Sequence, residues 1–171
     1  MAMHDEALRT FVVGLKNAHA MEKQALSIMK PQLSRIANYP EIADRLRKHI
    51  GETEMQLKRV DTILNDLRER HSAVKDMMLS VGGSMASLSH VITGDEILKN
   101  TFANYAFEHY EIAAYTSLSA LCETLSQPDA AHLIEQSLEE ERAMAAWIED
   151  HIVPTTRRFV QLEASEATAN I

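Results

Sequence analysis

Apolar side chains recur at alternating steps of four and three residues along four long stretches of the chain. This spacing places them on one face of an α-helix and is typical of helices that pack side by side in a bundle. The stretches cover about residues 4–38, 40–70, 95–125 and 130–153. The pattern therefore predicts an all-α fold, a four-helix bundle with helices roughly 45 Å long.

Prolines mark several of the predicted helix ends. Pro40 suits the first turn of the second helix, and Pro128 lies in a break before the fourth. Pro31 falls inside the first stretch, where it is expected to kink the helix or separate its last turn. Pro154 is expected to end the fourth helix, so the bundle is predicted to span residues 1–154. Residues 155–171 then form a C-terminal tail, with a short helix expected over 157–163.

The stretch 71–94 is expected to be a crossover between two helical hairpins, because it mixes glycine and serine with apolar residues. A short helix is expected over 73–80 and a loop at Gly82-Gly83. Thr93 or Asp95 is the expected N-cap of the third helix. The methionine- and serine-rich segment 77–92 is apolar enough to form a patch on the surface, which favours a homodimer.

The composition fits a single helix-rich domain, with 46% hydrophobic and 25% charged residues and only five glycines and four prolines. A net charge of −8 argues against nucleic acid or an anionic membrane as a partner. The N-terminus does not resemble a signal peptide, and no stretch approaches the ~20 apolar residues of a membrane span. The single cysteine, Cys122, fits the apolar stripe of the third helix and a reducing compartment. We therefore expect a cytoplasmic protein.

Polar residues interrupt the middle of each apolar stripe. Every helix carries two polar residues three positions apart, of which the second is a glutamate. Two residues at this spacing lie on the same face of a helix. The pairs are His19 with Glu22, His49 with Glu52, Glu108 with Glu111, and Ser137 with Glu140. An uncompensated buried carboxylate costs several kcal/mol, so protons or cations must neutralise this group. The sequence therefore predicts metal ligands at Glu22, Glu52, Glu108, Glu111 and Glu140.

The role of the two histidines at this predicted metal site is open. His49 and His19 could bind metal directly, or could support a ligand or lie hydrogen-bonded in the core. A single glutamate in such a stripe can also be a boundary residue whose carboxylate reaches solvent, although four helices with one at matching depth argue against this. The run of charged residues around Glu140 is expected to form mainly a solvent-exposed face. Glu139 or Glu141, which flank Glu140, could also contribute to the metal site.

Between about Thr10 and Trp147 the chain resembles the YciE/YciF-like branch of the ferritin-like superfamily, bacterial proteins associated with stress. The most specific motif is EHYEIAAY at 108–115, and supporting motifs are LKNAHAMEKQAL, HIGETEMQLKRV and SLEEERA. The resemblance implies a ferritin-like bundle with two metal ions, iron first and manganese or zinc as alternatives. It also implies that the five glutamates named above are ligands.

The chain departs from related di-iron proteins, which place a histidine three or four residues after the second- and fourth-helix glutamates. Here those positions hold Met55 and Gln56, then Ala143 and Met144, of which only Gln56 could bind metal weakly. The departure favours weaker binding or a single ion. The sequence leaves two functions open: an iron-oxidising or peroxide-reducing protein of stress response, and a non-enzymatic structural or interaction protein with a remnant metal site.

Overall fold

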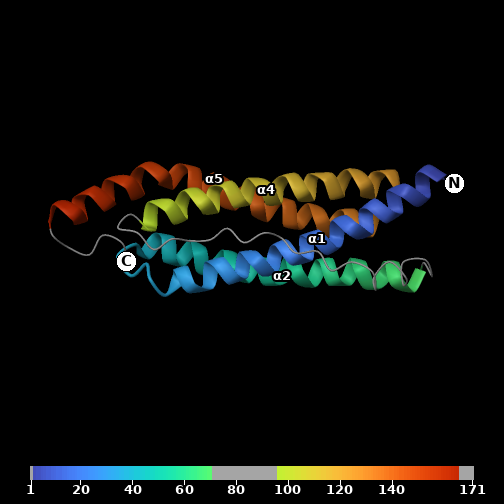
Figure 1. Ribbon diagram of the computed structural model, residues 1–171, viewed down its shortest axis with the longest axis horizontal. Helices are drawn as coiled ribbons and strands as arrows, with labels where there is room; N and C mark the ends of the chain where they lie inside the picture. The colour runs from blue at the N-terminus through green and yellow to red at the C-terminus, as the bar shows by residue number, and fades with distance from the viewer. Residues whose placement is uncertain (1, 71–95, 166–171) are drawn as a thin grey trace.

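The computed structural model describes residues 2–70 and 96–165 of the chain. These residues form four helices, α1 (Ala2–Leu33), α2 (Pro40–Arg70), α4 (Glu96–Thr124) and α5 (Pro128–Ala164). The helices lie side by side as an elongated bundle (Figure 1), which confirms the predicted all-α four-helix bundle. The short helix expected over 73–80, the N-cap at 93 or 95 and the patch at 77–92 lie outside the described residues.

The bundle consists of two helical hairpins, α1 with α2 and α4 with α5. Helix α1 also packs on α4, and α2 packs on α5, so the helices form a ring in the order α1, α2, α5, α4. Figure 1 shows that α1 and α5 run in one direction and α2 and α4 in the other. Helix α2 therefore ends at the opposite end of the bundle from the start of α4, as in bundles with one long crossover.

Two apolar cores fill the bundle, one toward each end. The first core is centred on Phe11, Leu15, Tyr115, Leu118 and Ile134. The second is made by residues such as Met29, Leu46, Ile97, Met144 and Ile148. The positions between these cores along each helix carry buried polar side chains, which are Glu22, His49, Thr53, Gln56, Glu108, Glu111, Ser137 and Glu141. We refer to these eight residues, together with the half-buried Glu52, Arg59 and Glu140 that contact them, as the polar layer.

The fourth helix continues through Pro154, so the prediction that this proline ends it is wrong. A proline inside a helix removes one backbone hydrogen bond and usually kinks or breaks the helix. Here the continuation is held by packing, because Leu162 is buried in the second core and Phe159 packs against it. The expected boundary between residues 154 and 155 therefore lies inside a continuous helix.

The first helix ends at Leu33, five residues before the end that its apolar pattern predicts. Pro31 lies within its last turn, as expected of a proline that weakens the helix there. The chain then turns through hydrogen bonds from Arg35 N to Gln32 O and from Tyr39 N to Ile36 O. Ile36 and Tyr39 are buried in the second core, so their apolar periodicity reflects packing of the connection rather than more helix.

Helix α4 ends in a Schellman motif, a C-terminal turn that usually contains glycine in the left-handed conformation. Gln127 N donates to Cys122 O at 2.9 Å, and Ser126 N donates to Glu123 O at 3.1 Å. Ser126 has a φ of 53°, which a side chain makes unfavourable. This turn brings α5 back against α4.

Substituting Ser126→Gly is expected to raise the free energy of unfolding by about 1 kcal/mol, because glycine adopts a positive φ without a steric penalty. The melting temperature should rise by roughly 2–4 °C, measured by thermal unfolding with circular dichroism. Ser165→Gly is the control, because Ser165 also follows a helix but has a φ of −94°. An equal gain in both variants would contradict the explanation.

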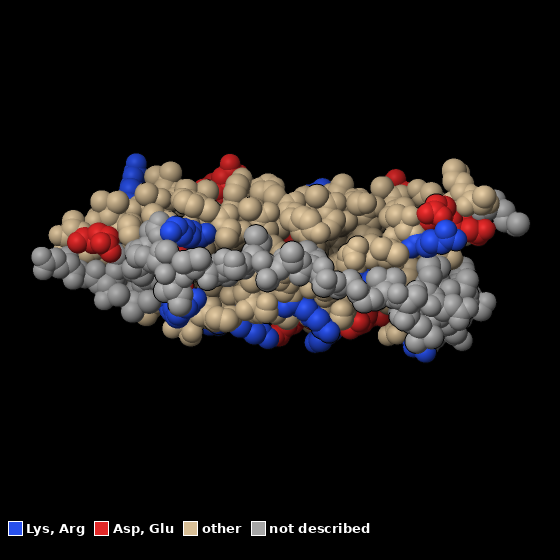
Figure 2. All heavy atoms as spheres, viewed as in Figure 1, with Lys and Arg blue, Asp and Glu red and all other residues tan. Residues whose placement is uncertain are grey.

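The face shown in Figure 2 carries lysine and arginine interspersed with aspartate and glutamate among the described residues, rather than one patch of a single sign. None of the described helices holds a stretch long and apolar enough to span a membrane.

Cys122 is buried in the first core, and burial raises the pKa of its thiol to about 11. The thiol therefore stays protonated and acts as a core residue.

Candidate metal centre

Four buried side chains of the polar layer converge at one point. His49 comes from α2, Glu108 and Glu111 from α4, and Glu141 from α5. Each offers one ligand atom, and these atoms all lie within 4.8 Å of one another. A metal ion bound by oxygen and nitrogen at roughly 2.0–2.4 Å places opposite ligands about 4–5 Å apart. The four residues, which we call the cluster, are therefore close enough to share one ion.

His49 is held so that one ring nitrogen faces the cluster. Its Nδ1 donates a hydrogen bond to Glu52 Oε2 at 3.0 Å. Its Nε2 lies 3.2 Å from Glu108 Oε2 and 3.5 Å from Glu141 Oε2. Histidine ligands of metals commonly donate their other ring N–H to a carboxylate, which fixes the ring orientation. Glu52 performs this role here, and it is itself paired with Arg45 at 2.9 Å and Lys48 at 3.2 Å.

Several carboxylate oxygens of the cluster are buried without a hydrogen-bond partner. They are Glu108 Oε2, Glu111 Oε1 and both oxygens of Glu141. Most buried polar atoms in proteins are hydrogen-bonded, and an unpaired one costs about 1–3 kcal/mol or more when charged. Among the described residues, His49 Nε2 is the nitrogen that approaches these oxygens, at 3.2 Å from Glu108 Oε2 and 3.5 Å from Glu141 Oε2, and oxygens gathered around an imidazole in this way are a donor set that a metal cation requires. The residues present therefore fit a carboxylate-bound metal.

Burial changes the proton affinity of these groups. It raises the pKa of Glu111 well above its usual value, and the negative charge of Glu141 adds to the effect. Burial likewise raises the pKa of Glu141, although His49 opposes the increase. Burial lowers the pKa of His49, but the charge of Glu108 and the contact with Glu52 outweigh it and raise this pKa to about 10. Without a metal, protons on these groups compensate the buried charge.

Glu22 lies beside the cluster and is fully buried on α1. Its Oε1 accepts a hydrogen bond of 2.5 Å from the Tyr115 hydroxyl, and its Oε2 has no partner. Burial raises the pKa of Glu22 to about 7, although the Tyr115 hydrogen bond and the charge of His49 lower it. Glu22 thus belongs to the same buried electrostatic system, but is not one of the four converging residues.

The remaining predicted ligands are not among the four converging residues. Glu140 is paired with Arg59, whose two terminal nitrogens contact its oxygens at 2.6 and 2.8 Å. Gln56 is fully buried and donates to Glu140 at 3.0 Å. His19 is partly exposed and lies 3.3 Å from Asp61. Glu52 contacts His49, as described above. Of the predicted residues, the structure brings together Glu108, Glu111 and His49.

Glu141 is the cluster residue that the pattern placed on the solvated face. Three consecutive glutamates, 139–141, occupy this part of α5, and one residue rotates the side chain by about 100°. The frame that contains Ile134, Leu138, Ala145 and Ile148 is buried, and Glu141 belongs to it. The available sequence signal was the more strongly apolar frame of Glu141, because Glu140 shares its frame with the polar residues Ser137 and His151.

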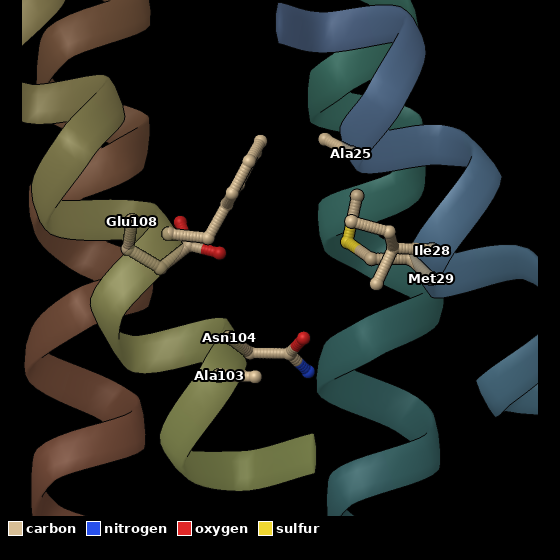
Figure 3. A pocket seen from close by; sticks show the side chains of 7 residues that line it. Ala25, Ile28, Met29, Ala103, Asn104 and Glu108 are labelled. Carbon is tan, nitrogen blue, oxygen red and sulfur yellow. The ribbon is translucent and has the colours of Figure 1, made fainter. Parts of the chain in front are cut away.

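A cavity of about 10 Å³ lies beside Glu108, between α1 and α4. Figure 3 shows Ala25, Ile28 and Met29 on the α1 side, with Ala103, Asn104 and Glu108 on the α4 side. Its volume is close to the space that one water molecule needs. The lining of this cavity is mainly apolar, with Asn104 and the Glu108 carboxylate as its polar residues.

A crossover four-helix bundle with inward-facing carboxylates from several helices defines the class of ferritin-like proteins. Residues 6–161 match the family described as a domain of unknown function, DUF892. The chain belongs to this family. It is 30% identical over 141 residues to Protein YciF of Escherichia coli K12, an alignment that covers 78% of this chain and 82% of YciF. The predicted YciE/YciF-like membership is thereby confirmed.

Two solved structures share the fold. A protein from Xanthomonas campestris pv. campestris is 31% identical, with a TM-score of 0.76, and the match covers 93% of this chain and 99% of that one. The structure of YciF, described as an E. coli stress protein, matches with a TM-score of 0.63 at 24% identity, over 84% of this chain and 92% of that one. These likenesses support the same helix order and crossover.

Proposed function

We propose that this protein binds a transition metal, iron in the first place, through His49, Glu108, Glu111 and Glu141. The observation that carries the proposal is the set of buried cluster oxygens without hydrogen-bond partners. Three carboxylates and one imidazole form a donor set that suits iron and manganese, whereas zinc sites commonly use thiolates or more imidazoles. Glu52 supports the proposal by holding His49 with one nitrogen toward the cluster.

We further propose that the bound metal serves in a stress response. YciF is described as a stress protein, and this chain shares its family. Bound iron supplies one-electron exchange with oxygen or peroxide. The chain contributes a site enclosed by protein, because the cluster residues are all buried. Glu111 and Glu141 can hold protons when no metal is bound, since burial raises their pKa values.

Metal content after anaerobic loading with Fe(II) tests the proposal. We expect at least one equivalent of iron after desalting, measured by elemental analysis, and consumption of hydrogen peroxide by the loaded protein but not by the apoprotein. Manganese loaded in parallel should compete for the same site. Less than about half an equivalent of either metal would show that the cluster is not a binding site, because a specific site fills to at least one ion.

The second candidate is a non-enzymatic structural or interaction protein. The ion pair of Arg59 with Glu140 and the contacts of Arg45 and Lys48 with Glu52 favour it, because they compensate part of the polar layer without a metal. This function predicts that the protein stays folded and metal-free under the same loading. A cytoplasmic location, the homodimer and the ligand roles of Glu22 and Glu140 stay predictions of the sequence.

A further inference from the structure

Arg59 lies in the polar layer and forms an ion pair with Glu140. Its guanidinium contacts both oxygens of Glu140, at 2.6 and 2.8 Å, and donates to Ser137 Oγ at 3.3 Å. Gln56 donates to the same carboxylate at 3.0 Å. Paired two-point contacts between arginine and a carboxylate are strong and geometrically specific. Glu140 is therefore fully engaged by protein groups.

The geometry of the cluster fits one ion better than two. Its four ligand atoms lie within 4.8 Å of one another, which is about the span of ligands around a single metal. In two-metal sites the ions lie about 3.5–4 Å apart, so even with bridging carboxylates a second ion draws on donors beyond the four ligand atoms around the first. In the described part of the chain, the buried or half-buried carboxylates that remain in this layer are Glu22, Glu52 and Glu140.

Each of these three carboxylates already has at least one protein partner. Glu52 contacts Arg45, Lys48 and His49. Glu22 accepts the Tyr115 hydroxyl on one oxygen and keeps the other free of partners. Glu140 is held by Arg59. Among the described residues outside the cluster, only one oxygen of Glu22 and one of Gln56 remain buried without a partner, and together they are too few donors for a second ion.

We propose that the cluster binds a single divalent transition-metal ion, and that Arg59 supplies the fixed positive charge that replaces a second ion. This inference rests on the proposed function and concerns the number of ions. Arg59 is a residue that determines metal stoichiometry, not a ligand. Removing its charge releases Glu140, which together with Glu22 and Gln56 then offers donors for a second ion.

The number of bound ions in the full chain tests this inference. Apoprotein is titrated with Mn(II), and bound ions are counted by native mass spectrometry, while electron paramagnetic resonance distinguishes isolated Mn(II) from a spin-coupled pair. We expect one isolated ion in the natural protein, and two coupled ions in Arg59→Gln. The double variant Arg59→Gln with Glu140→Gln should return to one ion.

Two further variants separate the charge of Arg59 from general effects. Arg142→Gln removes an arginine that pairs with Glu139 at 2.7 Å on the exposed surface of α5, and should keep one ion. Arg59→Lys keeps the positive charge and should also keep one ion, even if Arg59→Gln folds poorly. Two ions in the natural protein, or a single ion in well-folded Arg59→Gln, would overturn the inference and leave the proposed function standing. No bound ion in the natural protein would overturn the proposed function itself.

Discussion

Substituting Glu141→Gln is expected to weaken metal binding by at least about 100-fold, because an amide replaces a buried anionic ligand. Both oxygens of Glu141 are buried without hydrogen-bond partners, and the side chain faces His49 and the two α4 glutamates. The loss can be measured as the dissociation constant for Mn(II) by isothermal titration calorimetry. The substitution keeps the shape of the side chain, so the fold should persist.

Its two neighbours provide matched controls on the same helix. Glu139 is exposed and pairs with Arg142, so Glu139→Gln should leave the dissociation constant unchanged. Glu140→Gln tests the ligand that the sequence pattern indicates, and should weaken binding much less than Glu141→Gln. If Glu140→Gln abolished binding and Glu141→Gln did not, the cluster would be misassigned and the pattern-derived ligand set would be favoured.

The apoprotein is expected to lose stability as the pH rises from about 5 to about 9. In the unfolded chain Glu22 titrates near 4.5, whereas burial raises its folded-state pKa to about 7. The folded state therefore binds more protons between these values, and stability is lost as the pH rises through them. The loss for Glu22 is on the order of 3 kcal/mol, at about 1.4 kcal/mol per pKa unit.

His49 and the cluster glutamates change stability in the same direction. The contribution of His49 is present below its usual pKa of 6.5 and is lost as the pH rises through about 10. The raised pKa values of Glu111 and Glu141 likewise favour the folded state at low pH and oppose it at high pH. At 2–4 °C per kcal/mol, the melting temperature of the apoprotein should fall by roughly 10 °C from pH 5 to pH 8.

Metal should reverse this trend, because its ligands bind in the deprotonated form. At about 1,000 times the dissociation constant, the ion adds roughly 4 kcal/mol to the free energy of unfolding. Thermal unfolding followed by circular dichroism, with and without Mn(II) at several pH values, measures both effects.

The variant Glu22→Gln removes one titrating group, so its apoprotein should lose less stability between pH 5 and 7. A melting temperature that rises with pH in the apoprotein would contradict the assignment of these buried groups.

The sequence predicted the helices well where their apolar pattern was long and uninterrupted. Helix α2 begins at Pro40 and ends at Arg70, as its periodicity indicates. The errors arose at prolines and connections. Pro154 is a strong helix breaker locally, but Leu162 and Phe159 gain contacts with the second core only if the helix continues. Tertiary packing therefore outweighed local propensity at this position.

The prediction of metal ligands likewise succeeded where the helical pattern was sufficient and failed where tertiary packing decided the outcome. The proximity of Glu108 and Glu111 could be predicted because their spacing on α4 puts both on one face, and this face is buried. Glu141 was only an auxiliary candidate, because a run of three glutamates does not itself show which one faces inward; that signal lies in the apolar residues of its helical frame. His49 was predicted as a secondary candidate, and the structure brings it into the cluster because Glu52 holds its other nitrogen.

By itself, the sequence determined that the chain forms long helices with polar residues near the middle of each buried face. Both follow from periodicity, which depends only on the order of residues along one helix. Only the tertiary structure decided which carboxylates share a point in space and which are paired with arginine. The rotation of α5 brings Glu141 to the cluster, while Glu140 meets Arg59 from α2. These choices depend on how helices from distant parts of the chain are rotated and set against one another, and periodicity within one helix does not contain that information.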